Sequence, residues 1–268
     1  MTFDSWTESE LITFFMVLMR ISTLLVLIPV FSDKVVPPPV KVLLSITFAV
    51  IIFPVLRASG YVQVQNAEIW TQSAGRLVIA VAGEILIGMC VGFVAQLVFH
   101  AIQIAGDFMS QLMGFSMASL YDPHMESQTV VLGQLFGALA MLTFLAVDGH
   151  HVLFRAMVES FHLIPQGHLS MGVALKDSMV KLVGNTVMFG IQLSAPMAAC
   201  MLLVNIVYGV LGRALPQLNI LTLSMASSAF IGGFVLLVTY PGFQTGMSSI
   251  FHTYFDDLRQ FLVVYGGK

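Results

Sequence analysis

Three neighbouring residues near the middle of the sequence have side chains that commonly bind metal ions. Asp148, His150 and His151 offer one carboxylate and two imidazoles. A zinc site needs three or four such ligands held in a fixed geometry. Adjacent histidines on a helix point to different faces, and no further ligand follows at a matching spacing. We interpret the segment as a loop at a membrane edge, and predict neither a metal ion nor another cofactor.

Ser116 is a candidate nucleophile, because residues 114–118 read GxSxA. The nucleophile elbow of hydrolases reads GxSxG and places its serine beside backbone oxyanion donors. Ser116 with His150 or His151 would make an intramembrane hydrolase, but the second glycine is missing and the sequence offers no oxyanion element. A phosphate-binding GxxxxGK[ST] sequence is missing as well. The sequence therefore predicts no catalytic residue.

Ionisable side chains inside apolar segments are a further kind of candidate. Glu84, His100 and Asp107 could form the proton relay of a secondary transporter, with a small-molecule site near a helix kinked at Pro196. Such a carrier would contain inverted repeats and would work as a single chain. The sequence has no such repeat, so a transporter stays the less favoured alternative.

Arg20 and Glu84 each lie in an apolar run. Arg20 is in the middle of residues 11–30, where a cation costs roughly 2.5 to 3.5 kcal/mol on insertion scales. Glu84 is either a functional intramembrane carboxylate, or a structural one that neutralises Arg20 or stays protonated in helix packing. The sequence leaves both interpretations open.

One face of the segment 77–99 is polar and small. Its members recur at every fourth position and are Glu84, Gly88, Gly92, Gln96 and His100. Gly88 and Gly92 make a small-xxx-small pattern, which lets a second helix backbone approach closely. The pattern indicates a helix that packs against another helix.

The segment 105–123, AGDFMSQLMGFSMASLYDP, interrupts the apolar pattern between two long apolar runs. Its Met109, Met113 and Met117 recur every four residues, which on a helix stacks three flexible thioethers along one face. Such a face could close around an irregular moving object. The plainer interpretation, which periodicity alone favours, is a re-entrant or amphipathic helix whose methionines fill gaps in the core.

The composition places the chain in a membrane. Charged residues are 9% of the sequence, hydrophobic residues are 57%, and the mean hydropathy is +0.92, whereas soluble domains have about 25% charged residues. The net charge of -3 comes without a basic patch, so we expect no nucleic-acid partner. Cys90 and Cys200 lie in apolar runs and are expected to be free thiols.

We expect an all-α fold built from apolar helices. Residues 11–30 and 218–240 are each long enough to span a bilayer, which takes about 20 residues. The three prolines at 37–39 predict an extended corner, and 165–181 reads as a polar connection. Residues 183–211 are too long for one simple span and predict a kinked or broken helix pair at Pro196. The tail predicts a separate amphipathic helix around 251–262.

Short motifs in a fixed order occur along nearly the whole sequence, and by them the chain resembles the FliR/SctT family of type III secretion export gates. The motifs are FxxxxR at 15–20, VPxxVK at 36–41, EILIG at 84–88 followed by Gly92, Phe93 and Gln96, AG at 105–106, MGxSxA at 113–118, DP at 122–123, DGH at 148–150 and RxxPQLNI at 213–220. Each motif is weak alone, but their order and spacing are specific.

The resemblance implies a non-enzymatic subunit of the flagellar export gate. It implies assembly with FliP and FliQ into a closed helical channel, contact with FlhB and FlhA, and passage of unfolded flagellar proteins. Residues 1–181 would be a FliP-like helical part that contains the plug loop 105–123. Residues 182–268 would be a FliQ-like helical hairpin with a C-terminal amphipathic helix. The expected location is the bacterial inner membrane at the flagellar basal body, and the virulence injectisome is the homologous alternative.

The resemblance also implies roles for individual residues. The plug role falls on Met109, Gln111, Met113, Gly114, Phe115 and Met117. Where the family pattern has GxQMG, this chain reads SQLMG, so no specific role follows for the amide of Gln111. Structural or interface roles fall on Arg20, Glu84, Gly88, Gly92, Asp122, Pro123, Arg213, Pro216, Gln217 and Asn219.

Overall fold

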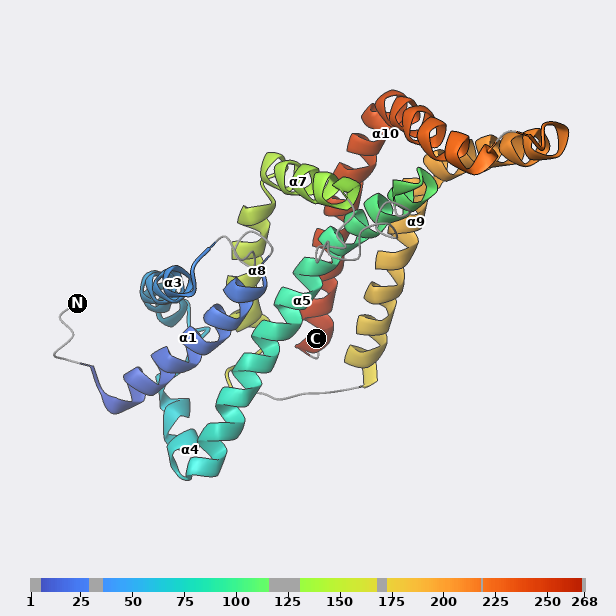
Figure 1. Ribbon diagram of the computed structural model, residues 1–268. Coiled ribbons are helices and arrows are strands. Elements are labelled where there is room, and N and C mark those ends of the chain that lie inside the picture. Colours follow the sequence, from blue (N-terminus) through green and yellow to red (C-terminus); the bar gives the residue numbers. More distant parts are fainter. Residues whose placement is uncertain (1–5, 29–35, 116–130, 168–172, 218, 267–268) are drawn as a thin grey trace. The chain divides into compact units, whose positions relative to one another are not determined.

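The computed structural model describes residues 6–28, 36–115, 131–167, 173–217 and 219–266, and these are helices joined by turns, without a strand among them (Figure 1). The all-α expectation is confirmed for this part of the chain. The elements are α1 (Glu8–Leu27), α3 (Pro38–Ala58), η2 (Val64–Asn66), α4 (Ala67–Thr71), α5 (Ala74–Leu112), α7 (Val131–Ala146), α8 (Gly149–Leu163), α9 (Val173–Ala214) and α10 (Ile220–Tyr265).

The first two long helices show how local chemistry sets their ends. Helix α1 starts with a capping box, in which Glu10 N donates to Thr7 Oγ1 at 3.3 Å and Thr7 N donates to Glu10 Oε2 at 3.0 Å. Helix α3 begins at Pro38, so the extended corner predicted at 37–39 is wrong for Pro38 and Pro39. The first helical turn needs no N–H partner, and a fixed φ near that of a helix suits proline there.

Two helices are longer than the sequence patterns indicated. Helix α9 has 42 residues and continues through Pro196, and α10 has 46 residues and continues through Pro241. The predicted break in 183–211, the polar connection over 173–181 and the separate tail helix are therefore wrong. In an apolar environment the backbone has no water to bond, so a helix that loses one hydrogen bond at a proline still keeps the rest.

Five helices are long and apolar enough to cross a membrane, or six if α7 and α8 count as one span, within the described residues. They are α1, α3, α5, α9 and α10. The expected membrane-derived helical fold agrees with this count.

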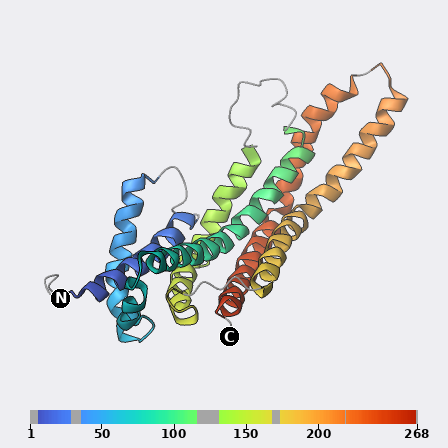
Figure 2. The ribbon, with the colours of Figure 1, turned by 90° about the horizontal axis from the view of Figure 1, so that it is seen from below.

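The chain divides into two compact units. Unit 1 comprises 1–97, 149–182 and 254–268, and unit 2 comprises 98–148 and 183–253. Each has its own core: Met16, Ile21, Leu56 and Phe161 are buried in unit 1, and Phe136, Phe144 and Phe251 in unit 2. In unit 2, α9 and α10 lie side by side as a hairpin (Figure 2), with Tyr208 Oη and Ser227 Oγ 2.6 Å apart.

The glycine face of α5 lies against α1 in unit 1. A Cβ at Gly88 would be 2.7 Å from the carbonyl oxygen of Arg20, and one at Gly92 would be 2.5 Å from Leu27 Cβ. These contacts leave no room for any side chain at the two positions. The close helix approach that the spacing predicted is present.

Candidate functional site

A buried ion pair lies at the centre of unit 1. Arg20 Nε donates to Glu84 Oε2 at 2.6 Å, and Arg20 Nη2 donates to Glu84 Oε1 at 3.1 Å. Both side chains are fully buried. This bidentate geometry is the strong form of the arginine–carboxylate interaction.

The pair also holds the turn that follows α8. Arg20 Nη1 donates to the carbonyl oxygens of Ser160 at 3.0 Å and Ile164 at 3.1 Å, and Gly167 N donates to Glu84 Oε1 at 2.8 Å. The guanidinium lies over the ring of Phe161, 4.3 Å from its centroid. The pair therefore fastens α1, α5 and the end of α8 together.

The structure decides between the two interpretations of Glu84. Its carboxylate neutralises Arg20, so it is not a free base for a proton relay. The next polar residue on the same face of α5, Gln96, donates to the carbonyl oxygen of Leu27 at 2.7 Å. Because Arg20 and Glu84 are buried within one chain, they could affect a subunit interface only indirectly, by fixing the helices that form it.

The two histidines after α7 are oriented differently from the prediction that their side chains lie on different faces of a helix. Their rings do not point apart: the centroids of His150 and His151 are 4.1 Å apart in the first turn of α8. The positive end of the helix dipole lies at this turn and disfavours a cation. Asp148 precedes them in a turn, with a positive φ of 54°, but both histidines are helical, so the predicted loop is wrong for them. One ligand atom of each of the three residues lies within 4.8 Å of the others.

The central segment is described only up to Phe115. Helix α5 carries residues 105–112, and Gly114 follows with φ of +82°, a conformation that favours glycine. Ser116, Met117, Asp122 and Pro123 lie outside the described residues.

Met109 and Met113 fill the core of unit 2. Each is 3% exposed, and Met113 packs on Gly232 of α10, where a Cβ would collide with its side chain. The plainer interpretation, methionines as core fillers, therefore holds for these two residues. Gln111 is exposed and Phe115 is 40% exposed, so these side chains remain available at the end of α5.

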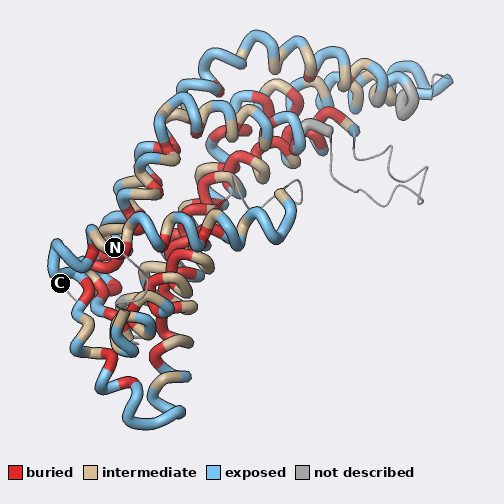
Figure 3. The backbone as a smooth tube through the Cα atoms, turned by 90° about the vertical axis from the view of Figure 1, so that its left-hand side faces the viewer, coloured by how far each residue is buried: buried red, intermediate tan, exposed pale blue. Residues whose placement is uncertain are grey.

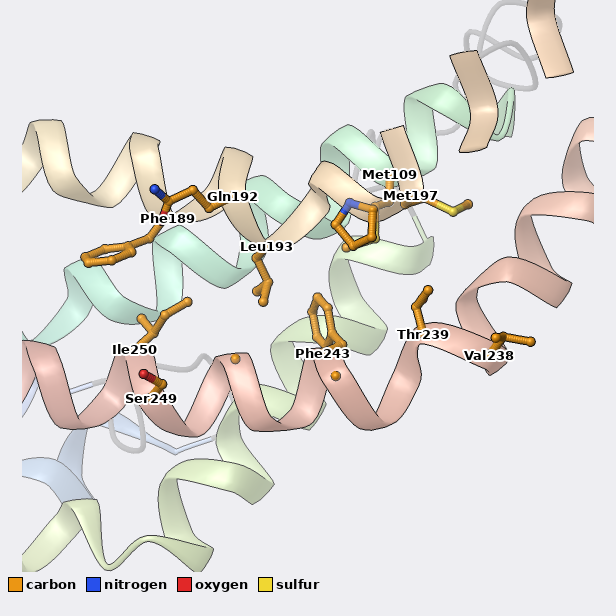
Figure 4. A pocket seen from close by; sticks show the side chains of 13 residues that line it. Met109, Phe189, Gln192, Leu193, Met197, Val238, Thr239, Phe243, Ser249 and Ile250 are labelled. Carbon is orange, nitrogen blue, oxygen red and sulfur yellow. The ribbon is translucent and has the colours of Figure 1, made fainter. Parts of the chain in front are cut away.

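An apolar cavity of about 570 Å³ lies beside Met109, between α9 and α10 (Figure 4). Pro196, Met197 and Phe243 line it, together with Gly242 and Gly246 of α10. The transporter alternative places a small-molecule site near Pro196, and this cavity lies there. Its full lining was not predictable, because its walls come from three helices that are distant in sequence.

The turn between α9 and α10 lies at an exposed tip of unit 2. Arg213, Pro216, Gln217 and Asn219 are all exposed there. Large apolar side chains nearby are exposed too, such as Leu203 at 65% and Phe230 at 82%. Figure 3 shows that exposed positions form long stretches of the helices. Apolar surface of this extent is covered by lipid or by other proteins.

Comparisons with known proteins agree with one another. Residues 11–254 match the family described as bacterial export proteins, family 1. A Bacillus subtilis protein named flagellar biosynthetic protein FliR is 27% identical over 256 residues, which cover 94% of this chain and 95% of that protein. Proteins of the same name from Escherichia coli (29% identity, 90% of this chain and 88% of the relative) and Pectobacterium carotovorum (27% identity, 98% and 97%) are similar over the same extent.

Proposed function

The chain belongs to the bacterial export proteins, family 1, and from this premise we propose that it is the subunit of the flagellar export apparatus that closes a channel built with FliP and FliQ. Relatives over nearly its whole length are named as flagellar biosynthetic proteins. Those names favour the flagellum over the virulence injectisome. FlhA and FlhB are the further expected neighbours, and the inner membrane at the basal body is the expected location.

The gate proposal rests on the contrast between buried and exposed side chains at the end of α5. Met109 and Met113 hold this end in the core of unit 2, whereas Gln111 and Phe115 are exposed beside them. A helix end that is packed against the core on one side and exposed on the other can place its exposed side chains in a channel and block it. Gly114, with its positive φ, supplies the bend at which the chain leaves the helix.

The proposed mechanism is a soft seal. Phe115 and Met117 fill the passage at rest and exclude water and ions, as hydrophobic constrictions do in channels. An unfolded polypeptide displaces them, because thioether side chains change rotamer at little cost. Gln111 lies at the edge of the seal, and Met109 and Met113 act as its anchor within the core.

The exposed tip of the α9–α10 hairpin is the proposed subunit contact. Arg213, Pro216, Gln217 and Asn219 leave their side chains on the surface there, and exposed apolar residues of both helices extend the contact area. We keep 1–181 as the FliP-like part and 182–268 as the FliQ-like hairpin. Nothing in this mechanism requires catalysis by the chain, and energy for export would come from other components.

Co-purification tests the proposed assembly. The tagged chain, produced with FliP and FliQ in one membrane, should be recovered as a stable complex of the three proteins. Produced alone, it should be recovered in lower amount or as aggregate, because the exposed apolar side chains of α9 and α10 are uncovered. Recovery of a stable, monodisperse single chain that does not bind FliP or FliQ would contradict the proposal.

A further inference from the structure

A polar pocket lies in unit 1, away from the central segment. It has a volume of about 320 Å³, and its walls are the segment after α3, from Gly60 to Asn66 in η2, and the end of α8 with the turn after it, from Phe161 to Gln166. Five of its side chains can form hydrogen bonds: Tyr61, Gln63, Asn66, His162 and Gln166. This volume is at the lower end of the range that ligand sites usually have, about 300–1,000 Å³.

Gln166 is the unusual residue of this pocket. Its side chain is 8% exposed, and neither Oε1 nor Nε2 has a hydrogen-bond partner among the described residues. A buried carboxamide normally has partners, because leaving its donor and acceptor unpaired is unfavourable. The side chain of Gln166 is therefore available to a partner that the described residues do not supply.

The pocket is held in shape before any ligand arrives. On one wall, Arg20 binds the carbonyl oxygen of Ile164 and Glu84 binds the amide of Gly167, so the residues on both sides of Gln166 are fixed. On the other wall, Tyr61 N donates to the carbonyl oxygen of Leu56 at 3.1 Å. The rings of Tyr61 and His162 lie 4.6 Å apart and join the two walls.

The chemistry of the lining favours a neutral ligand. Among the described residues, none that lines the pocket is Asp, Glu, Lys or Arg, so a phosphate or carboxylate would lack its usual cation and a metal ion its anionic ligands. Three carboxamides line the pocket instead, and each offers an N–H donor next to a C=O acceptor. A peptide group has the same donor and acceptor and is their natural complement.

We propose that this pocket binds a main-chain peptide group of another polypeptide of the export apparatus, with Gln166 as its principal hydrogen-bonding partner. This assignment of the ligand rests on the proposed function, which supplies polypeptide neighbours. Gln63 and His162 are exposed at the mouth, where a passing or resident chain can enter.

Photo-crosslinking in the assembled apparatus tests this site directly. Position 63, which precedes η2, lines the pocket, whereas position 65 within η2 is also exposed but does not line it, so p-benzoylphenylalanine is placed at each in turn. Position 63 should crosslink one defined stretch of one polypeptide, identified by mass spectrometry, several-fold more strongly than position 65. A crosslink that persists without export substrates identifies a resident subunit, and one that disappears identifies a substrate.

Substitution of Gln166 gives a second test, because the Tm of the complex should change in opposite directions if the pocket holds a peptide group and if the amide is simply unpaired. In Gln166→Met the side chain keeps its length but loses donor and acceptor. If a peptide group occupies the pocket, the variant should lower the crosslink from position 63 several-fold and lower the Tm of the complex. If the amide is simply unpaired, the apolar replacement should leave the crosslink unchanged and raise the Tm.

Equal crosslinking at 63 and 65, crosslinks to lipid alone, or a Gln166→Met complex with an unchanged or higher Tm would overturn the proposal. The position 63 crosslink uses the native Gln166, so it remains decisive if the variant does not fold. Failure of the assembly itself is seen separately, as a chain that does not co-purify with FliP and FliQ.

Discussion

Arg20 and Glu84, 64 positions apart in sequence, neutralise each other in the interior of unit 1 through two side-chain hydrogen bonds of 2.6 and 3.1 Å. The same pair binds backbone groups of Ser160, Ile164 and Gly167. Each of the two charges would be unfavourable alone in an apolar helix. Together they hold α1, α5 and the end of α8 in contact.

Removing one partner of this pair should destabilise the protein strongly. Arg20→Met or Glu84→Leu leaves an uncompensated buried charge, which costs about 3–5 kcal/mol in the free energy of unfolding. The double variant Arg20→Met/Glu84→Leu should be more stable than either single variant, since no charge stays unpaired. The Tm of the purified complex, measured by thermal unfolding, should therefore be higher for the double variant than for either single variant.

Measuring protein export by the Arg20→Met/Glu84→Leu variant shows whether the pair has a structural role or takes part in proton transfer. If Glu84 only fastens helices, the double variant should support motility in proportion to the amount of complex formed. A well-folded double variant in normal amount without export would contradict the structural role.

Gly88 should not accept even a methyl group. Its Cβ would lie 2.7 Å from a backbone oxygen of α1, and such overpacking typically costs 1–3 kcal/mol. Gly75→Ala, on the same helix with open space around it, is the matched control and should be neutral or up to about 1 kcal/mol stabilising. Equal Tm values for Gly88→Ala and Gly75→Ala would show that the helices are not in close contact there.

Two adjacent glycines of α10 test the anchor of the central segment. Gly232→Ala should push Met113 out of its place and loosen the end of α5, whereas Gly233→Ala meets open space. We expect Gly232→Ala, but not Gly233→Ala, to raise the permeability of cells that carry the complex to small solutes. Shortening the colliding side chain with Met113→Ala should reduce the effect of Gly232→Ala, and the absence of any such rescue would contradict the contact.

Periodicity was sufficient to predict some parts of this structure. The fourfold spacing from Glu84 to Gln96 predicted a helix face that packs on another helix, and the methionine spacing predicted core-filling side chains at Met109 and Met113. Both features depend on neighbours within one helix turn, which the sequence displays directly.

Other parts depend on context that a linear sequence does not carry. The passage of α9 through Pro196 runs against proline's usual effect and depends on the apolar surroundings. Proline suits the start of α3 at Pro38, but three prolines in a row do not show which of them begins the helix. The pocket around Gln166 joins turns about 100 residues apart, which no local pattern could reveal. The seal itself involves Met117, which lies outside the described residues, so its place remains part of the proposal.

The most direct test of the gate compares two phenylalanines of equal exposure. Phe108 and Phe115 are each 40% exposed, but only Phe115 belongs to the proposed seal. Deleting residues 110–118 would be a less specific test than these single substitutions, because the deletion would also remove the buried Ser110 and Met113 from the core. Uptake of a small solute by cells with the complete complex should rise several-fold in Phe115→Ala and stay at the wild-type level in Phe108→Ala. Wild-type uptake in both variants, with normal amounts of complex, would contradict the account.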